Sequence, residues 1–127
     1  IVMMPLDVTH KVLTTPERVE RIRAVNNPAA RALVEMLIFY GRYNEKKYGS
    51  EGGPLHDPTT IAWMLRSDLF SGRECNVEIE TFSELTRGAT VVDWWGVTDR
   101  PKNAFVLNNA DADGFFDLLA ERLANLS

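Results

Sequence analysis

The chain has 127 residues, of which 45% are hydrophobic and 25% charged, and its formal net charge is −4. This composition predicts one ordinary globular domain. The excess of acidic residues argues against nucleic acid or an anionic membrane as a partner. The single cysteine, Cys75, rules out an intrachain disulfide and a cysteine-based zinc site, and fits a reducing cytoplasmic location. No apolar run approaches the roughly 20 residues of a membrane span, so we expect no membrane segment.

The first six residues form a nearly continuous apolar run, which predicts a buried strand of a parallel sheet. A buried strand is an unusual start for a natural protein, so we expect the chain to be the tail of a longer one. Asp7 and His10 follow at the carboxyl end of this strand, where open α/β sheets bind ligands. A polar connection to the next helix also accounts for both residues, and it is the interpretation that we prefer.

Two helices are predicted next. Thr14 and Glu17 have the spacing of a capping box, which indicates a helix that ends near residues 26–27. Asn27 followed by proline begins a second and longest helix, whose apolar residues recur with the period of an amphipathic helix. This helix runs into the polar, tyrosine-rich residues 40–48 and a glycine-rich loop. Two alternatives stay open for residues 40–48: a lid over a ligand, or a charged helix end that frays into a linker.

The centre of the sequence is the loop Gly-Gly-Pro-Leu-His-Asp-Pro at residues 52–58. Pro58 suits the first position of a helix over residues 58–65, so Asp57 is expected at the N-cap and at the positive end of the helix dipole. His56 and Asp57 then present an imidazole and a carboxylate on a stiff junction. From these residues alone, a structural role, in which Asp57 caps the helix and His56 fills a corner, is slightly favoured over a chemical one.

The second half of the chain predicts three strands, over residues 76–80, 90–95 and 104–107, with the last two paired antiparallel because their connection is short. Trp94 and Trp95 point to opposite faces, so one is expected in the core; stacking on a base is the alternative. A final helix, capped by Asp111 or Asp113, is expected to pack on a sheet. Its apolar face comprises Phe115, Phe116, Leu118, Leu119, Leu123 and Leu126.

Common catalytic motifs are not found. The sequence has no phosphate-binding Gly-x-x-x-x-Gly-Lys loop, no dinucleotide fingerprint and no Gly-x-Ser-x-Gly nucleophile elbow. With only His10 and His56, a multi-histidine metal site is excluded. The pair His56–Asp57 remains as the candidate site. Its one carboxylate is far short of the roughly six to eight oxygen ligands that Ca²⁺ takes.

Four segments resemble the inosine-uridine preferring nucleoside hydrolases. Residues 4–11 contain the Leu-Asp-Val-Thr-His segment of that family, and residues 54–58 are its Pro-Leu-His-Asp-Pro. Residues 86–93 are similar to its Thr-x-Gly-x-Thr-Val-Val-Asp, and residues 114–119 to its terminal helix. The matches occur in order and cover nearly the whole chain, so the resemblance is specific and now favours a chemical role for the His56–Asp57 pair.

The resemblance implies an activity and a role for each matching residue. Members of the family cleave the N-glycosidic bond of ribonucleosides to ribose and free base, and a Ca²⁺ ion holds the ribose hydroxyls and the attacking water. By this resemblance His56 is the catalytic proton donor to the leaving base, and Asp57 is a calcium ligand. Tyr48, and more weakly Asn44, correspond to residues that face the base in bacterial pyrimidine-preferring members. Such an enzyme would serve nucleoside catabolism and salvage.

The chain also departs from the family pattern. It lacks the Asp-x-Asp-x-Gly-x-Asp-Asp loop that supplies most calcium ligands, and the Glu-Phe-Asn segment that grips ribose. The resemblance therefore implies one domain over residues 1–127, the C-terminal portion of an open, Rossmann-like α/β fold with helices packed on a mixed sheet and a late antiparallel part. We expect the isolated chain to be inactive, with Ca²⁺ a cofactor of the full-length enzyme only. The alternative is an inactive fragment or a non-catalytic nucleoside-binding module.

The expected partners follow from the same argument. A ribonucleoside is the expected substrate. Sheet edges left unpaired in a partial fold favour a homo-oligomer or association with another chain.

Overall fold

The computed structural model describes residues 1–49 and 51–126, apart from the side chains of Glu45 and Tyr48. In chain order its elements are β1 (Val2–Met3), α1 (Leu6–Thr9), α2 (Pro16–Arg23), α3 (Pro28–Tyr48), α4 (Asp57–Leu65), the 3₁₀ turn η1 (Ser67–Leu69), β2 (Phe70–Cys75), β3 (Val77–Ile79), β4 (Thr90–Val92), β5 (Ala104–Ala110) and α5 (Ala112–Ala124).

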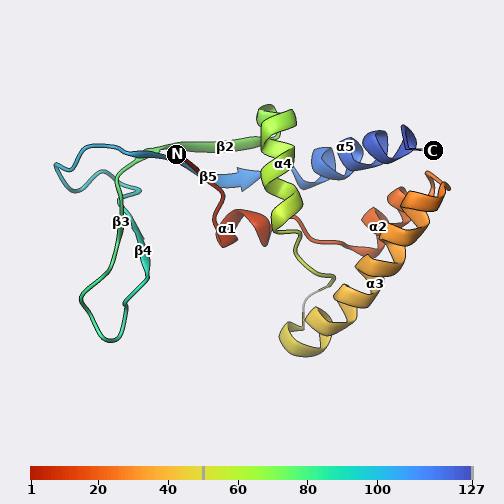
Figure 1. Ribbon diagram of the computed structural model, residues 1–127, viewed down its shortest axis with the longest axis horizontal. Helices are drawn as coiled ribbons and strands as arrows, with labels where there is room; N and C mark the ends of the chain where they lie inside the picture. Colours follow the sequence, from red (N-terminus) through yellow and green to blue (C-terminus); the bar gives the residue numbers. More distant parts are fainter. Residues whose placement is uncertain (50, 127) are drawn as a thin grey trace.

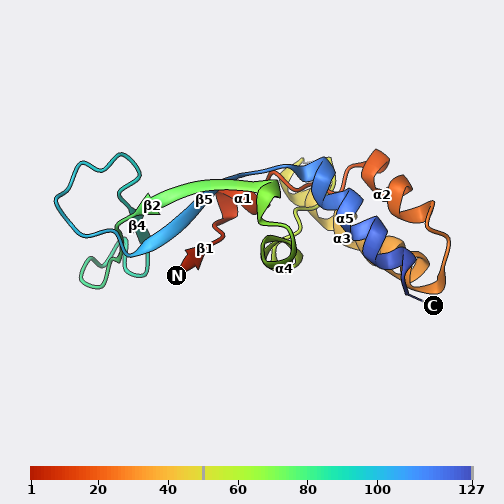
Figure 2. The ribbon, with the colours of Figure 1, turned by 90° about the horizontal axis from the view of Figure 1, so that it is seen from above.

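The strands form two sheets. A mixed three-stranded sheet has the order β1-β5-β2, in which β1 is parallel and β2 antiparallel to β5. β3 and β4 form a separate antiparallel ribbon. The long strands β2 and β5 run along the molecule, the β3–β4 ribbon projects at one end, and α2, α3 and α5 gather at the other (Figures 1 and 2). The open, mixed α/β architecture that the sequence predicts is confirmed.

One expectation about strand pairing is wrong, and one strand was missed. The strand over residues 104–107 does not pair with residues 90–95; β5 lies between β1 and β2, and β4 pairs with β3. The sequence did not predict β2 at all. Its residues, Phe-Ser-Gly-Arg-Glu-Cys, include a glycine and two charges and show little apolar alternation, so the strand depends on its ladder with β5.

The apolar N-terminal run is not a buried central strand in this structure. Only Val2 and Met3 pair, and β1 lies at the edge of the sheet, where the side chains of Ile1 and Val2 are 95% and 48% exposed. Leu6 already belongs to α1. Among the described residues only β5 flanks β1, so nothing covers its other edge.

The helices largely follow their sequence signals. Asn27 caps α3, since its side-chain oxygen accepts a hydrogen bond from the amide of Ala30 (2.8 Å). α3 spans 21 residues and is the longest described helix, and it includes residues 40–48, which agrees with a charged helix end rather than a lid loop. The capping residue of α2 is Thr15 rather than Thr14.

The main core lies among the helices rather than on the sheet. Asp111 is the N-cap of α5, because its carboxylate accepts a hydrogen bond from the amide of Gly114 (3.0 Å). α5 packs mainly against α2 and α3, so the expectation that it covers a sheet is wrong. Phe116 and Ile22 are completely buried where these helices meet. The reason is geometric: α5 continues beyond the end of β5 and points away from the sheet (Figure 2).

A smaller core surrounds Cys75 at the other end of β5. Trp94 packs against it and is half-buried, whereas Trp95 is 79% exposed, which confirms that only one of the two tryptophans is a core residue. The loop that follows is held by Asp93, whose carboxylate accepts hydrogen bonds from the hydroxyl and amide of Thr98 and the amide of Val97. These hydrogen bonds, led by that of the Thr98 hydroxyl, lower the pKa of Asp93.

None of the helices in the described ranges combines the length and the apolar character that crossing a bilayer would require.

A substitution at Gly72 tests the contact between β2 and β5. It lies at a β-bulge, where an added Cβ would overlap the backbone carbonyl of Val106. We expect Gly72→Ala to lower the free energy of unfolding by about 1–3 kcal/mol, because the clashing group is backbone and cannot rotate away. Urea unfolding followed by circular dichroism measures the effect.

The matched control is Gly41→Ala within α3, where the nearest atom to the new Cβ is 3.9 Å away. It should be neutral or stabilising, because alanine is the better helix former. Equal unfolding midpoints for the two variants would contradict the prediction.

Candidate functional site

The loop that precedes α4 is tied to the segment after α1 by backbone hydrogen bonds. The amide of Leu55 donates to the carbonyl of Val12 (3.0 Å), and the amide of Thr14 donates to the carbonyl of Gly53 (3.0 Å). Leu13 and Pro54 form an antiparallel bridge between these two bonds. This short ladder brings residues 12–14 and 53–55 together and fixes where the chain enters α4.

The side chain of Thr14 reinforces the ladder. Its buried hydroxyl accepts a hydrogen bond from the amide of Gly53 (2.9 Å) and donates one to the carbonyl of the same residue (3.0 Å). A Cβ at Gly53 would lie 2.6 Å from the ring of Tyr40 and 3.0 Å from Nδ2 of Asn44, so a larger residue would displace these side chains. The capping-box threonine of the sequence thus serves the loop rather than α2.

The first turn of α4 is arranged differently from the prediction. His56 is the N-cap residue and Asp57 is the first helical residue, and neither side chain caps the helix. Two threonine hydroxyls in this turn bond to backbone carbonyls: that of Thr59 donates to the carbonyl of Leu55, and that of Thr60 to the carbonyl of Asp57 (2.7 Å). Pro58 is thus the second helical residue and not the first, and the N-cap lies one residue earlier than predicted. The purely structural interpretation of Asp57 as a cap is therefore wrong.

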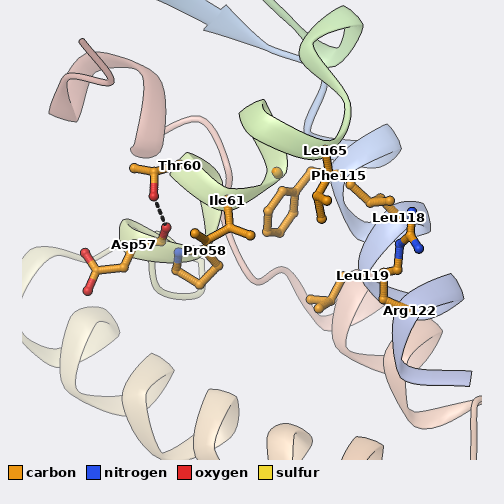
Figure 3. A pocket seen from close by; sticks show the side chains of 10 residues that line it. Asp57, Pro58, Thr60, Ile61, Leu65, Phe115, Leu118, Leu119 and Arg122 are labelled. Atoms are coloured by element: carbon orange, nitrogen blue, oxygen red, sulfur yellow. Dashed lines mark hydrogen bonds between the residues drawn. The ribbon is translucent and has the colours of Figure 1, made fainter. Parts of the chain in front are cut away.

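The carboxylate of Asp57 is exposed and forms no hydrogen bond or ion pair with the residues that the structure describes. It lies at the N-terminal end of α4, where the helix dipole favours negative charge. In Figure 3 it points away from the apolar side chains of α4 and α5. It is therefore available to a cation or a polar ligand on that side.

His56 is held by α1. Its Nδ1 atom lies 2.7 Å from the hydroxyl of Thr9, which is 2% exposed. The ring of His10 lies beside that of His56, with 5.4 Å between the ring centroids. The structure therefore brings His10 to the candidate site, whereas Asp7 lines a separate cavity of about 210 Å³ next to β1 and Trp94.

The other two predicted site residues belong to α3. Asn44 is 4% exposed, and its Nδ2 atom donates to the carbonyl of Tyr40 one turn earlier (3.0 Å). It thus lies beneath the loop that leads to His56, packed against Gly53. Tyr48 ends α3, but its side chain lies outside the described part of the structure. A substrate-binding role for either residue stays a prediction.

An apolar groove of about 530 Å³ lies between α4 and α5 (Figure 3). Its walls are formed mainly by Pro58, Ile61, Leu65, Phe115, Leu118 and Leu119. His56 is not among the lining residues. Asp57 does line the groove, so the groove borders the candidate pair on the Asp57 side although the imidazole does not line it.

The metal-ligating side chains among the described residues do not form a complete metal site. No group of three or more histidine, cysteine, aspartate or glutamate side chains within residues 1–49 and 51–126 could hold a metal ion. Ca²⁺ takes roughly six to eight oxygen ligands, of which Asp57 could supply one or two. The described residues alone therefore do not form the calcium site that the sequence resemblance implies.

These features agree with the comparison with known protein families. The model of the inosine-uridine preferring nucleoside hydrolases matches residues 1–117, and the chain belongs to this family. Nucleoside hydrolases are generally calcium-dependent.

Particular relatives are similar over almost the whole chain. An uncharacterized protein of Schizosaccharomyces pombe, C1683.06c, is 49% identical over 126 residues, which are 99% of this chain and 41% of that protein. The pyrimidine-specific ribonucleoside hydrolase RihA of Photobacterium profundum is 50% identical over 126 residues, 98% of this chain and 41% of RihA. The chain thus spans about two fifths of the length of these relatives and matches a C-terminal part of them.

Solved structures show the same fold. A purine-preferring ribonucleoside hydrolase from Gardnerella vaginalis superposes with a TM-score of 0.77 at 28% identity, over 95% of this chain and 38% of that one. The plant nucleoside hydrolase PpNRh1 superposes with a TM-score of 0.81 at 22% identity, over 98% of this chain and 41% of that one, a likeness of fold alone.

Sequence reasoning found the imidazole–carboxylate pair but missed the residues that position it. The sequence singled out Thr9 only as part of the Leu-Asp-Val-Thr-His segment. Thr14 was predicted to cap the helix that follows it, whereas its hydroxyl bonds to Gly53. Both act on residues about 40 positions away, and no local pattern reports such a contact.

Thr14→Val tests the ladder. The substitution removes both side-chain hydrogen bonds and leaves the buried amide of Gly53 without a partner, so we expect a loss of about 1–3 kcal/mol in the free energy of unfolding. Thr14→Ser keeps the hydroxyl and should lose much less. Chemical denaturation measures both, and a valine variant as stable as the serine variant would contradict the assignment.

A calcium titration tests whether these residues hold the ion by themselves. Titration calorimetry of the purified 127-residue chain with CaCl₂ should show no binding in the micromolar range, because one carboxylate is too few ligands. Micromolar affinity that disappears in Asp57→Asn would show that these residues hold the ion by themselves, and would overturn the expectation.

Proposed function

We propose that this chain supplies the base-side part of a ribonucleoside hydrolase active site, which cleaves the N-glycosidic bond to give ribose and free base. Family membership over residues 1–117 supports the reaction class. The observation that carries the proposal is the His56–Asp57 junction: a rigid loop presents an imidazole and a carboxylate, and neither side chain is used to cap the helix that follows.

The imidazole suits the leaving base. Glycosidic cleavage passes through an oxocarbenium-like transition state, in which the departing group gains from protonation. Nδ1 of His56 is engaged by Thr9, so Nε2 is the atom left to face a substrate. In this proposal Nε2 donates the proton, an acid catalysis typically worth about 10²–10⁴-fold in rate.

Asp57 has a different role in the proposal. Its carboxylate supplies a ligand to the Ca²⁺ ion on which the family generally depends. The remaining ligands and the base that activates water come from outside the described residues. The isolated chain is accordingly inactive as a hydrolase in this proposal, and it acts as the C-terminal part of a longer catalytic unit.

The substrate is proposed to be a pyrimidine ribonucleoside, uridine or cytidine. The support is the higher identity to relatives named pyrimidine-specific, 50%, than to the purine-preferring structure, 28%. Tyr48 and Asn44 are proposed to border the base. Asn44 already lies beneath the loop that carries His56, and Tyr48 follows it by about one helical turn.

Association and location complete the proposal. The open edge of β1 and the exposed apolar side chains Met64 and Leu65 favour a homo-oligomer or association with another chain. The single cysteine, free and buried, fits the cytoplasm, where nucleoside salvage would take place.

A non-catalytic nucleoside-binding module is the second candidate. It is favoured by one observation, the lack of a metal-binding cluster among the described residues. A panel of nucleosides assayed with the complete gene product, with and without chelator, separates the two candidates. Release of free base that a chelator abolishes is expected of the hydrolase and not of the binding module.

His56→Ala tests the catalytic assignment. In the complete gene product we expect uridine cleavage to slow by about 10²-fold or more, because the leaving base loses its proton donor. Calcium affinity should survive, since the substitution leaves Asp57 in place. Steady-state release of free base and calcium titration measure the two properties, and unchanged turnover would defeat the assignment.

A further inference from the structure

We infer that two copies of this protein associate by a reciprocal contact, in which the tip of the β3–β4 ribbon of each copy enters the α4–α5 groove of the other. The ribbon tip comprises residues 80–89, which join β3 to β4, and the groove is the apolar one that Figure 3 shows. The inference concerns association alone and does not depend on the proposed catalysis.

The ribbon tip carries two large apolar side chains that the described part of the chain leaves uncovered. Phe82 and Leu85 are 91% and 93% exposed, although the other residues of the tip are small or polar. Keeping a phenylalanine and a leucine in water forgoes the free energy that their burial would provide, roughly 1.5–3 kcal/mol for each side chain. Such a pair at the end of a projecting ribbon indicates a surface that binds another one.

Hydrogen bonds hold the ribbon tip in one conformation. The carboxylate of Glu80 accepts the amides of Phe82 (2.6 Å) and Ser83 (3.1 Å), and the carbonyl of Glu80 accepts the amide of Gly88 (2.7 Å). The hydroxyl of Ser83 accepts the amide of Thr86 (3.3 Å). Because the two apolar side chains are presented by an ordered turn, the tip loses little conformational entropy when it binds.

The α4–α5 groove has the properties of a receptor for such a tip. Ile61 and Leu65 in its walls are 51% and 53% exposed, whereas Phe115 and Leu118 are buried beneath them. Its volume of about 530 Å³ accommodates large apolar side chains. An aromatic anchor that fills an apolar pocket is the arrangement that contributes most to the affinity of protein interfaces.

The charges beside the two surfaces have opposite signs. Glu84 lies between the two apolar residues of the tip, and Arg122 lines the groove at the end away from Asp57 (Figure 3). Neither forms an ion pair with any residue in the described part of the chain. Glu84 of one copy can therefore pair with Arg122 of the other when the tip enters the groove, and such pairing favours this partner and this orientation.

A second copy is the partner that uses both surfaces at once. The ribbon projects at one end of the molecule while α4 and α5 lie towards the other, so the tip does not reach the groove of its own copy (Figures 1 and 2). When two copies lie antiparallel about a two-fold axis, each tip meets the opposite groove. The contact is then made twice and the pair is closed, as the symmetry of an isologous dimer requires.

The first experiment measures the mass of the complete gene product by size exclusion with light scattering over a range of concentrations. We expect at least a dimer. Leu85→Asp should raise the dissociation constant about tenfold or more, because the aspartate would have to enter an apolar groove. The matched control is Val97→Asp: Val97 is 83% exposed but belongs to neither surface, so this variant should associate as the unmodified protein does.

A charge exchange identifies the partner surface. Glu84→Arg and Arg122→Glu should each weaken association, since each places like charges opposite one another. The double variant restores opposite charges and should recover most of the affinity, which a tip that contacts any other surface would not do. All these side chains are exposed, and circular dichroism checks that each variant keeps its fold.

Three results would overturn the inference: a monomeric gene product, association that Leu85→Asp leaves unchanged, or a charge exchange without recovery. If another part of the complete protein covers the groove, the second of these results is the one observed. Each would leave the catalytic assignment of His56 to its own kinetic test.

Discussion

The candidate site depends on the short ladder between residues 12–14 and 53–55. Two backbone hydrogen bonds and the doubly bonded hydroxyl of Thr14 join segments that are 39 residues apart in sequence. Buried backbone groups have to be paired, so the loop that precedes α4 has essentially one place to lie. That place puts His56 against Thr9 and Asp57 at one edge of the groove of α4 and α5, with its carboxylate pointing away from the apolar side chains there (Figure 3).

Two aspartates at helix starts show what distinguishes a structural carboxylate from an available one. Asp111 is the N-cap of α5 and accepts the amide of Gly114, so its side chain is committed to the helix. Asp57 occupies the first helical position of α4, and no side chain caps that helix. A carboxylate that is spared from capping keeps its oxygens available to a ligand.

The family relationship explains why the site looks partial. The chain matches the nucleoside hydrolases over most of its length, yet it spans about two fifths of the relatives. Its described residues provide one imidazole and one carboxylate at the candidate site, and they contain no metal-binding cluster. When the metal ligands and catalytic groups of an enzyme come from segments far apart in sequence, one part of the fold contains only some of them. Our proposal therefore assigns catalysis to the longer unit and proton donation to this part.

The sequence by itself determined the local features: the start of α3 with its Asn27 cap, most of the apolar face of α5, and the residues of the His56–Asp57 pair. These features are encoded by residues three or four positions apart, whose interactions the chain order already fixes. The tertiary structure alone decided that β2 exists and that β5 separates it from β1. It also decided that α5 packs on helices and that Thr9 holds His56 from 47 residues away. Such pairings depend on which surfaces compete for the same partner, and that competition is resolved only when the whole chain is packed.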